Sequence, residues 1–305
     1  MPAFSVSKSI VIDSSPESVR NKILDLRTWP EWSPWLLSEK EAKVLFTDDG
    51  KSYSWNGEIV GSGNLSVISE AADKIEFNLE FFKPWKSQAD VHFNFEKLGP
   101  KETRVTWSMD SALPFFMFFM KSMMINVISS DYDRGLRMLK NLLETGEVPS
   151  SLEFGHTKIE ELNVFGISAS CLVKDIGKSM EESFCKFGEI LELSDIKPVA
   201  PPLAIYHKWD FAKGLCDYTI GAPFSADTDA PSGFVTKTIP AGKCYTVEHT
   251  GPYQFIANAW AAGYSHMRAK QFTLNKKIDA FEIYLNDPKE VDEKELISVV
   301  HFPMK

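Results

Sequence analysis

The sequence predicts an α+β protein made of two domains, and three features of the chain indicate this organisation. In the first half, strand-like segments are followed by one long helical pattern. A polar segment with glycine and proline, Gly146 to Ser151, follows that pattern and marks the natural domain boundary. After His156, the order strand, helix, strand, strand can be followed twice. We therefore expect domains at residues 1–148 and 152–305, the second being a duplicated βαββ unit.

The first half begins with a strand-like segment at residues 4–12, followed by a helix start. Ser15 before Pro16 is typical of a helix N-terminus, so we expect a helix through about Leu26. Further strand-like segments cover residues 42–46, 51–59, 63–69, 74–81, 89–97 and 103–111, and the long helical pattern covers residues 115–144. This order predicts a curved antiparallel sheet that grips a long C-terminal helix.

Three tryptophans and two prolines lie close together after the first helix, in the segment Trp29-Pro30-Glu31-Trp32-Ser33-Pro34-Trp35. With this segment and its order of elements, region 3–145 resembles the SRPBCC superfamily, also called START-like or polyketide-cyclase-like. The resemblance implies a helix-grip fold whose internal cavity holds hydrophobic small molecules, and only some members are enzymes. The apolar run Phe115–Met124 is typical of such a lining, and equally of an ordinary helix–sheet core. We therefore expect a binding module.

The second half contains two segments of similar order. In the first, a strand pair covers residues 158–174, a helix 179–194, and strands 203–210 and 215–224. In the second, a strand covers residues 234–249, a helix 255–272, and strands 280–286 and 295–303. Ala204-Ile205-Tyr206 then corresponds to Ala280-Phe281-Glu282. A duplicated unit commonly packs around a pseudo-two-fold axis, and we expect a ligand groove on that axis.

The strand-like segment Ala280–Leu285 carries one acidic residue in an otherwise apolar and aromatic run. Because side chains alternate along a strand, Glu282 and Tyr284 share one face, while Phe281 and Ile283 share the other. A half-buried carboxylate costs free energy unless a hydrogen bond, a cation or a ligand compensates it. Glu282 is therefore the first candidate for a functional residue.

Three motifs of the second half occur together: His249-Thr250-Gly251-Pro252-Tyr253, a helix bearing Trp260 and Tyr264, and the run FEIYLNDP from Phe281. With these motifs, residues 156–305 resemble the GyrI-like family, the effector-binding domain also attached to AraC-type and MerR-type regulators. The resemblance implies a hydrophobic groove between duplicated halves and a buried glutamate that interacts with the ligand, which is often cationic and aromatic. By motif, that glutamate is Glu282. The helix-turn-helix segment of such regulators is not apparent in this sequence.

The predicted site combines aromatic side chains with one carboxylate. We expect Tyr206, Tyr253, Trp260, Glu282 and Tyr284 to bind the ligand, with Tyr206 opposite Glu282 on the other repeat. Aromatic faces beside a carboxylate favour a flat or cationic organic molecule. Some GyrI-like proteins are hydrolases, and that resemblance implies Glu282 as a base and Tyr284 or Tyr253 as a proton donor if this protein is an enzyme.

The composition argues against several classes of function. A net charge of −9, without a dense cluster of lysine and arginine, disfavours nucleic-acid binding. The longest apolar stretch, residues 113–120, is far too short to span a membrane, and no signal-peptide core is found, so we expect a cytoplasmic protein. The spacing of the histidines and cysteines does not match a metal site, and the sequence contains no Gly-rich phosphate loop. We therefore expect neither a metal nor a cofactor. The cysteines are expected to be free thiols: Cys171, Cys185, Cys216 and Cys244.

Three hypotheses of function stay open at the level of the sequence, and the oligomeric state stays open with them. The leading hypothesis is a cytoplasmic sensor or sequestering protein for a hydrophobic or aromatic small molecule. The second is a hydrolase or cyclase of xenobiotic or polyketide-like substrates, with Glu282 as its base. The third is a regulator that acts through a protein partner. The acidic surface is compatible with binding a basic protein, but a net charge of this size is also ordinary for a protein in solution.

Overall fold

The computed structural model describes residues 3–113, 115–210 and 213–305. The chain divides into two compact units, one extending to Val148 and the other beginning at Pro149. Each unit has its own antiparallel sheet, with helices packed against it. The architecture confirms the predicted α+β class.

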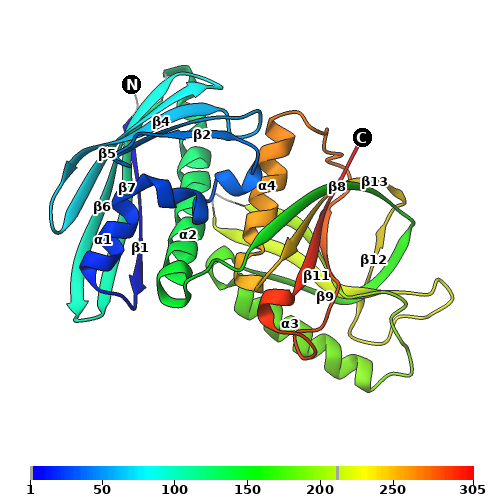
Figure 1. The fold of residues 1–305 in the computed structure, drawn as a ribbon. Coiled ribbons are helices and arrows are strands. Elements are labelled where there is room, and N and C mark those ends of the chain that lie inside the picture. The colour runs from blue at the N-terminus through cyan, green and yellow to red at the C-terminus, as the bar shows by residue number, and fades with distance from the viewer. Residues whose placement is uncertain (1–2, 114, 211–212) are drawn as a thin grey trace. The chain divides into compact units, whose positions relative to one another are not determined.

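The first unit is built on a seven-stranded antiparallel sheet in the order β1-β7-β6-β5-β4-β3-β2. Its strands are β1 Ala3–Ile12, β2 Lys43–Phe46, β3 Ser52–Asn56, β4 Ser62–Glu70, β5 Lys74–Lys83, β6 Ser87–Gly99 and β7 Glu102–Ala112. Its α-helices are α1 Pro16–Leu24 and α2 Lys121–Thr145, and 3₁₀ turns cover Leu26–Glu31, Leu36–Ser38 and Phe115–Met120. Figure 1 shows the long helix α2 lying alongside β1, the strand against which it packs.

Helix ends in this unit follow from the residues that occupy them. The Ser15 hydroxyl accepts a hydrogen bond from the Ser18 amide at 3.2 Å, and Pro16 takes the first helical position, as predicted for α1. Helix α2 ends where Gly146 adopts a left-handed φ of 88°. Its predicted start at Phe115 is wrong for the α-helix, because Phe115–Met120 forms a 3₁₀ turn, which is common ahead of an α-helix.

The Trp-rich segment supplies the core of the first unit. Trp29 and Trp32 are almost fully buried beside Trp107 of β7, with ring centroids 5.9 Å and 5.7 Å from the Trp107 ring. Trp107 in turn stacks on Tyr132 of α2, at 4.0 Å between ring centroids and 13° between ring planes. These rings fill the space between sheet and helix at this level, so this segment acts as packing that joins α2 to the sheet.

The second unit is built on an eight-stranded antiparallel sheet in the order β12-β9-β11-β10-β14-β15-β13-β8. Its strands are β8 Ser151–Ile159, β9 Leu162–Leu172, β10 Leu203–Asp210, β11 Leu215–Phe224, β12 Val235–Ile239, β13 Gly242–Thr250, β14 Ala280–Tyr284 and β15 Ile297–Pro303. Its α-helices are α3 Ile176–Glu192 and α4 Ala257–Arg268, and 3₁₀ turns cover Val173–Asp175, Tyr253–Phe255 and Glu293–Glu295. Helix α3 packs on β9 and β11, and α4 packs on β13 and β15.

The strand order of this sheet is symmetric about the β10–β14 pair. Strands β9, β11 and β10 on one side correspond to β13, β15 and β14 on the other. At the centre, Ile205 lies opposite Phe281, which is also its counterpart in the sequence alignment of the two repeats. The pseudo-two-fold axis therefore passes through this pair, and the predicted duplication is a structural one.

Two predicted strand boundaries in the second unit are wrong. The segment 234–249, predicted as one strand, is divided into β12 and β13 around Pro240, because proline lacks the N–H that a continuous ladder needs. The first strand pair begins at Ser151 instead of residue 158, within a segment predicted as linker, because Ser151 pairs with Thr250 of β13. Strands β8 and β12 thus each pair with the long strand of the other repeat.

Candidate functional site

Glu282 lies at the centre of the second sheet, on the face covered by α3 and α4. Its exposed fraction is 1%, and that of Tyr284 on the same face is 8%. The neighbouring residues Phe281 and Ile283 pack in a separate apolar cluster on the opposite face, as the alternation along β14 predicts. Burial of a carboxylate in this position requires compensation from its surroundings.

Three side chains compensate the Glu282 carboxylate by donating hydrogen bonds. The Tyr206 hydroxyl of β10 donates to Oε1 at 2.6 Å, and the Tyr284 hydroxyl donates to the same oxygen. The Trp260 indole N–H of α4 donates to Oε2 at 2.6 Å. Four of the five side chains predicted for ligand binding therefore meet at one point, which we call the Glu282 site: Tyr206, Trp260, Glu282 and Tyr284.

None of the groups that shift the pKa of Glu282 carries a positive charge. Burial raises the pKa of the Glu282 carboxyl above its ordinary value. The hydrogen bonds from three neutral donors lower this pKa, but by less than burial raises it. In the described part of the chain, its polar partners are two phenols and one indole. The site is therefore a carboxylate that is hydrogen-bonded by neutral aromatic side chains and is not paired with a positive charge.

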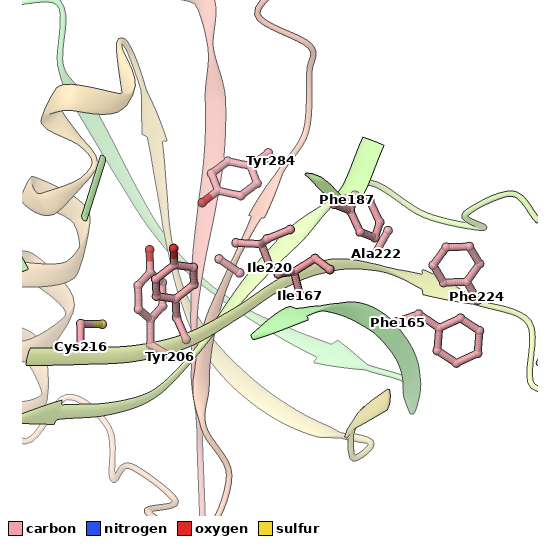
Figure 2. Packing of buried hydrophobic residues seen from close by; sticks show 11 residues of the cluster. Phe165, Ile167, Phe187, Tyr206, Cys216, Ile220, Ala222, Phe224 and Tyr284 are labelled. Atoms are coloured by element: carbon pink, nitrogen blue, oxygen red, sulfur yellow. The ribbon is translucent and has the colours of Figure 1, made fainter. Parts of the chain in front are cut away.

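The phenols of the Glu282 site remain protonated over the whole physiological range. Burial first, and then the charge of Glu282, raises the pKa of Tyr206 and of Tyr284 well above the ordinary value. Figure 2 shows both rings on the same face of the sheet, with their hydroxyls directed toward one region. Both phenols are thus fixed as hydrogen-bond donors to the carboxylate.

The aromatic rings around the carboxylate pack edge to face on one another. Trp260 meets Tyr206 edge to face at 4.9 Å between ring centroids. Tyr253, the fifth predicted residue, makes no hydrogen bond to Glu282 and packs edge to face on Tyr284 at 5.4 Å. With 37% of its surface exposed, Tyr253 belongs to the outer layer of the site.

The sequence did not single out three further residues around the site: Trp209, Phe184 and Met180. Trp209 stacks on Tyr206 at 5.3 Å, and Phe184 packs edge to face on Tyr284 at 5.5 Å. The Tyr206 hydroxyl also lies 3.4 Å from Met180 Sδ. Met180 and Phe184 are four residues apart on α3, so they share one helix face. Because α3 is the counterpart of α4, which was predicted to carry Trp260, the repeat itself was the signal for Met180 and Phe184.

The pseudo-two-fold axis explains why a tyrosine meets a glutamate here. Tyr206 and Glu282 occupy equivalent positions of β10 and β14, on either side of the central Ile205–Phe281 pair. Two equivalent positions next to an axis face each other on the same side of the sheet. The symmetry brings the two positions together, and the sequence places a donor at one of them and an acceptor at the other.

Among residues 3–113, 115–210 and 213–305, no group of three or more His, Cys, Asp and Glu side chains is arranged to hold a metal ion. Within the same ranges, every helix is too short or too polar to cross a bilayer.

Both units match known protein families. Residues 3–144 match the family described as polyketide cyclase / dehydrase and lipid transport, and residues 156–305 match the family described as GyrI-like small molecule binding domain. Both resemblances read from the sequence are thereby confirmed. No curated protein matches the chain significantly.

Three solved structures of similar proteins each cover about half of this chain. SAV2435 bound to tetraphenylphosphonium is 16% identical over 50% of this chain and 94% of that one, with a TM-score of 0.42. The C-terminal domain of EcmrR is 18% identical over 50% and 98%, with a TM-score of 0.44. A START superfamily protein from Mycobacterium smegmatis is 20% identical over 46% and 97%, with a TM-score of 0.34.

Proposed function

This chain is a fusion of an SRPBCC domain of the polyketide-cyclase type with a GyrI-like domain, and we propose that it binds a small aromatic cation at Glu282. In this proposal the protein is a sensor or sequestering module for that compound. The observation that carries the proposal is the buried Glu282 carboxylate, whose hydrogen-bond partners are all neutral. The family description of residues 156–305 supports small-molecule binding in general.

The electrostatics of the site favour a ligand that brings the missing positive charge. A buried carboxylate is costly without a cation, and its attraction to a charge is strong where water is excluded. The rings of Tyr206, Trp260 and Tyr284 surround the carboxylate. Faces of such rings attract cations and pack against flat groups. A neutral ligand of the same shape gains the packing but not the charge interaction.

A ligand reaches the carboxylate by displacing the outer side chains of the site. Tyr253 is 37% exposed and Trp260 is half-buried, whereas Tyr206 and Tyr284 are buried. Of the three hydrogen bonds to Glu282, only the one from Trp260 comes from a helix instead of the sheet. We therefore propose that Trp260 and Tyr253 move aside on binding, while Tyr206 and Tyr284 keep hold of the carboxylate.

Titration with tetraphenylphosphonium, a cation with four phenyl rings, tests the proposal by calorimetry or tryptophan fluorescence. The full-length protein is expected to bind it, and Glu282→Gln to lose at least about 30-fold in affinity, or about 2 kcal/mol, because a buried charge is removed from the pair. Neutral triphenylphosphine oxide is the matched probe and should bind the parent and the variant equally. Glu153→Gln, at an exposed glutamate of β8, is the matched variant and should keep the affinity of the parent.

The titration also has a clear negative outcome. Equal affinity of Glu282→Gln and the parent for tetraphenylphosphonium would show that the carboxylate is not the counter-charge of the ligand. Equal affinity of the parent for the cation and for the neutral phosphine oxide would contradict the proposal in the same way.

A second candidate is a hydrolase that uses Glu282 as its base, and one observation favours it. The pKa of Glu282 is raised by burial, beside two phenols that keep their protons, which is a suitable setting for acid–base chemistry. Here Glu282 positions or deprotonates a water molecule and Tyr284 donates a proton. Incubation with an electrophilic cyclopropane compound, followed by mass spectrometry, should then give a hydrated product with the parent and none with Glu282→Gln; turnover by the variant would rule Glu282 out as the base.

A further inference from the structure

We propose that Cys171 and Cys216 form a redox modification site next to the Glu282 site, where a small organic disulfide converts the two thiols into a cross-strand disulfide. Cys171 lies on β9 and Cys216 on β11, two neighbouring antiparallel strands. The two cysteines are direct partners in the register of these strands, and both thiols are free.

The register of the strands gives the pair a spacing that permits a disulfide. Residues directly opposite on antiparallel strands have Cα atoms about 4.5 or 5.5 Å apart, depending on the type of pair. Both spacings lie within the range of about 4.4–6.8 Å that disulfides require. The side chains of such a pair also project from the same face of the sheet, and here both cysteines pack in one apolar cluster.

That cluster is the one that includes the phenols of the Glu282 site. Along β11, every second residue from Cys216 to Phe224 belongs to it, including Tyr218. Tyr218 is paired with Tyr206, and Cys216 is paired with Trp209, which stacks on Tyr206. Figure 2 shows Cys216 at the Tyr206 end of the cluster, away from Phe165 and Phe224. The thiol pair is thus one row of side chains from Tyr206.

The two thiols differ in the way that a stepwise exchange requires. Cys216 is fully buried, and burial, then the neighbouring Cys171, raises the pKa of its thiol to about 12. Cys171 is partly exposed. An external reagent therefore meets Cys171 first, because the thiolate is the reactive form and access to Cys216 is blocked.

Atoms and electrons balance in the following two steps. The Cys171 thiolate attacks one sulfur of the small disulfide, forms a mixed disulfide and releases the first small thiolate. Cys216 loses its proton, attacks the Cys171 sulfur and releases the second small thiolate. The protein loses two electrons and two protons, and the small disulfide is reduced to two thiols. The fixed position of Cys216 opposite Cys171 compensates for its low thiolate fraction.

The other two cysteines serve as internal controls. Cys244 is as buried as Cys216, and burial raises the pKa of its thiol to about 11, but its strand partners are Thr157 and Pro303. Cys185 is exposed on α3 and is suited only to reaction with an external reagent or with another molecule. Replacing Cys185 with serine removes that side reaction without changing the buried core.

The experiment treats folded, full-length Cys185→Ser protein with 2,2′-dithiodipyridine and follows the released pyridine-2-thione by absorbance. We expect two thiones per protein, an intact mass lower by the two lost hydrogens, and a peptide containing Cys171 linked to one containing Cys216. Cys244 should remain alkylatable after unfolding. Adding Cys216→Ala should give one thione and a stable pyridyl adduct on Cys171.

Two outcomes would overturn the proposal. In the first, the Cys185→Ser protein itself keeps a stable pyridyl adduct on Cys171, and Cys216 is alkylated after unfolding. In the second, no thione is released from the folded protein, which would show that Cys171 is not accessible to the reagent. Both readings come from the Cys185→Ser protein alone, so they do not depend on whether Cys216→Ala folds.

Discussion

At the scale of single residues, the protonation of Glu282 links the site to the stability of the fold. A carboxyl whose pKa is higher in the folded than in the unfolded state binds more protons when folded. Its contribution to stability is then fully present below the unfolded pKa, about 4.3 for a glutamate, and is lost as the pH rises through the folded pKa. Because burial raises the pKa of Glu282, neutral pH is the less favourable condition for this residue.

We predict the corresponding pH dependence from Glu282→Gln, which cannot titrate. Between about pH 4 and pH 8, the thermal midpoint of the parent should fall relative to that of the variant, because only the parent has to ionise a buried carboxyl. Scanning calorimetry of both proteins over this range measures the difference. A difference that stays constant with pH would show that Glu282 has the same pKa in the folded and unfolded states.

The phenols of the site make a second prediction at this scale. Tyr206→Phe removes one donor to Glu282 Oε1 and should lower the free energy of unfolding by about 1.5–3 kcal/mol, as expected for a hydrogen bond to a charged group. Tyr264→Phe on α4 is the matched control, since burial alone sets the pKa of that phenol. The control should change stability by less than about 0.5 kcal/mol in urea unfolding. Similar losses in both variants would mean that the Tyr206 bond adds nothing specific.

The residues around Glu282 show what sequence reasoning can and cannot reach. Glu282 was identifiable because a carboxylate in an apolar, aromatic strand demands an explanation, and Tyr206 because the repeat aligns it with Glu282. The hydrogen bond from the Trp260 indole depends on how closely α4 packs on the sheet, which local patterns do not encode. The outer position of Tyr253 likewise depends on tertiary packing.

At the scale of elements, Gly263 sets how closely α4 approaches the sheet. A Cβ atom at this position would lie 2.1 Å from the Phe302 ring of β15. The Phe302 ring also packs edge to face on Trp260, at 5.4 Å between centroids. A side chain on Gly263 therefore has to push α4 and Trp260 away from the carboxylate.

Two glycine-to-alanine variants turn this into a measurement. Gly263→Ala should destabilise the protein by about 1–3 kcal/mol through overpacking against the Phe302 ring. Gly188→Ala on α3, the counterpart helix, meets nothing within 4 Å and should stabilise by about 0.5–1 kcal/mol, because alanine is the better helix former. Urea unfolding measures both, and equal effects would remove the role assigned to Gly263.

The elements themselves were predictable where local signals are strong. The α1 cap, the meander of strands and the end of α2 at Gly146 follow from residues next to one another in sequence. The break at Pro240 and the 3₁₀ turn at Phe115–Met120 were missed. At Pro240, strand-like residues on both sides of the proline favoured one continuous strand although proline lacks an N–H. At Phe115–Met120, an unbroken apolar run gave no sign of the tighter turn ahead of α2.

At the scale of the whole molecule, the two units have one feature in common: aromatic side chains pack between the helices and the sheet. In the first unit, Trp107 and Tyr132 complete an apolar stack between β7 and α2. In the second, the aromatic layer surrounds a carboxylate on the pseudo-two-fold axis. The pairing of β8 and β12 with the opposite repeat was not predictable, because such pairing joins segments far apart in the chain.

The most direct test of the central claim is to locate a bound cation by crystallography. Tetraphenylarsonium places an anomalously scattering arsenic where tetraphenylphosphonium has phosphorus. The claim predicts an anomalous peak beside the Glu282 carboxylate and within about 6 Å of an aromatic ring of the site, and no such peak in Glu282→Gln crystals soaked in the same way. Arsenic bound in the first unit or on the outer surface, with the Glu282 site unchanged, would contradict it.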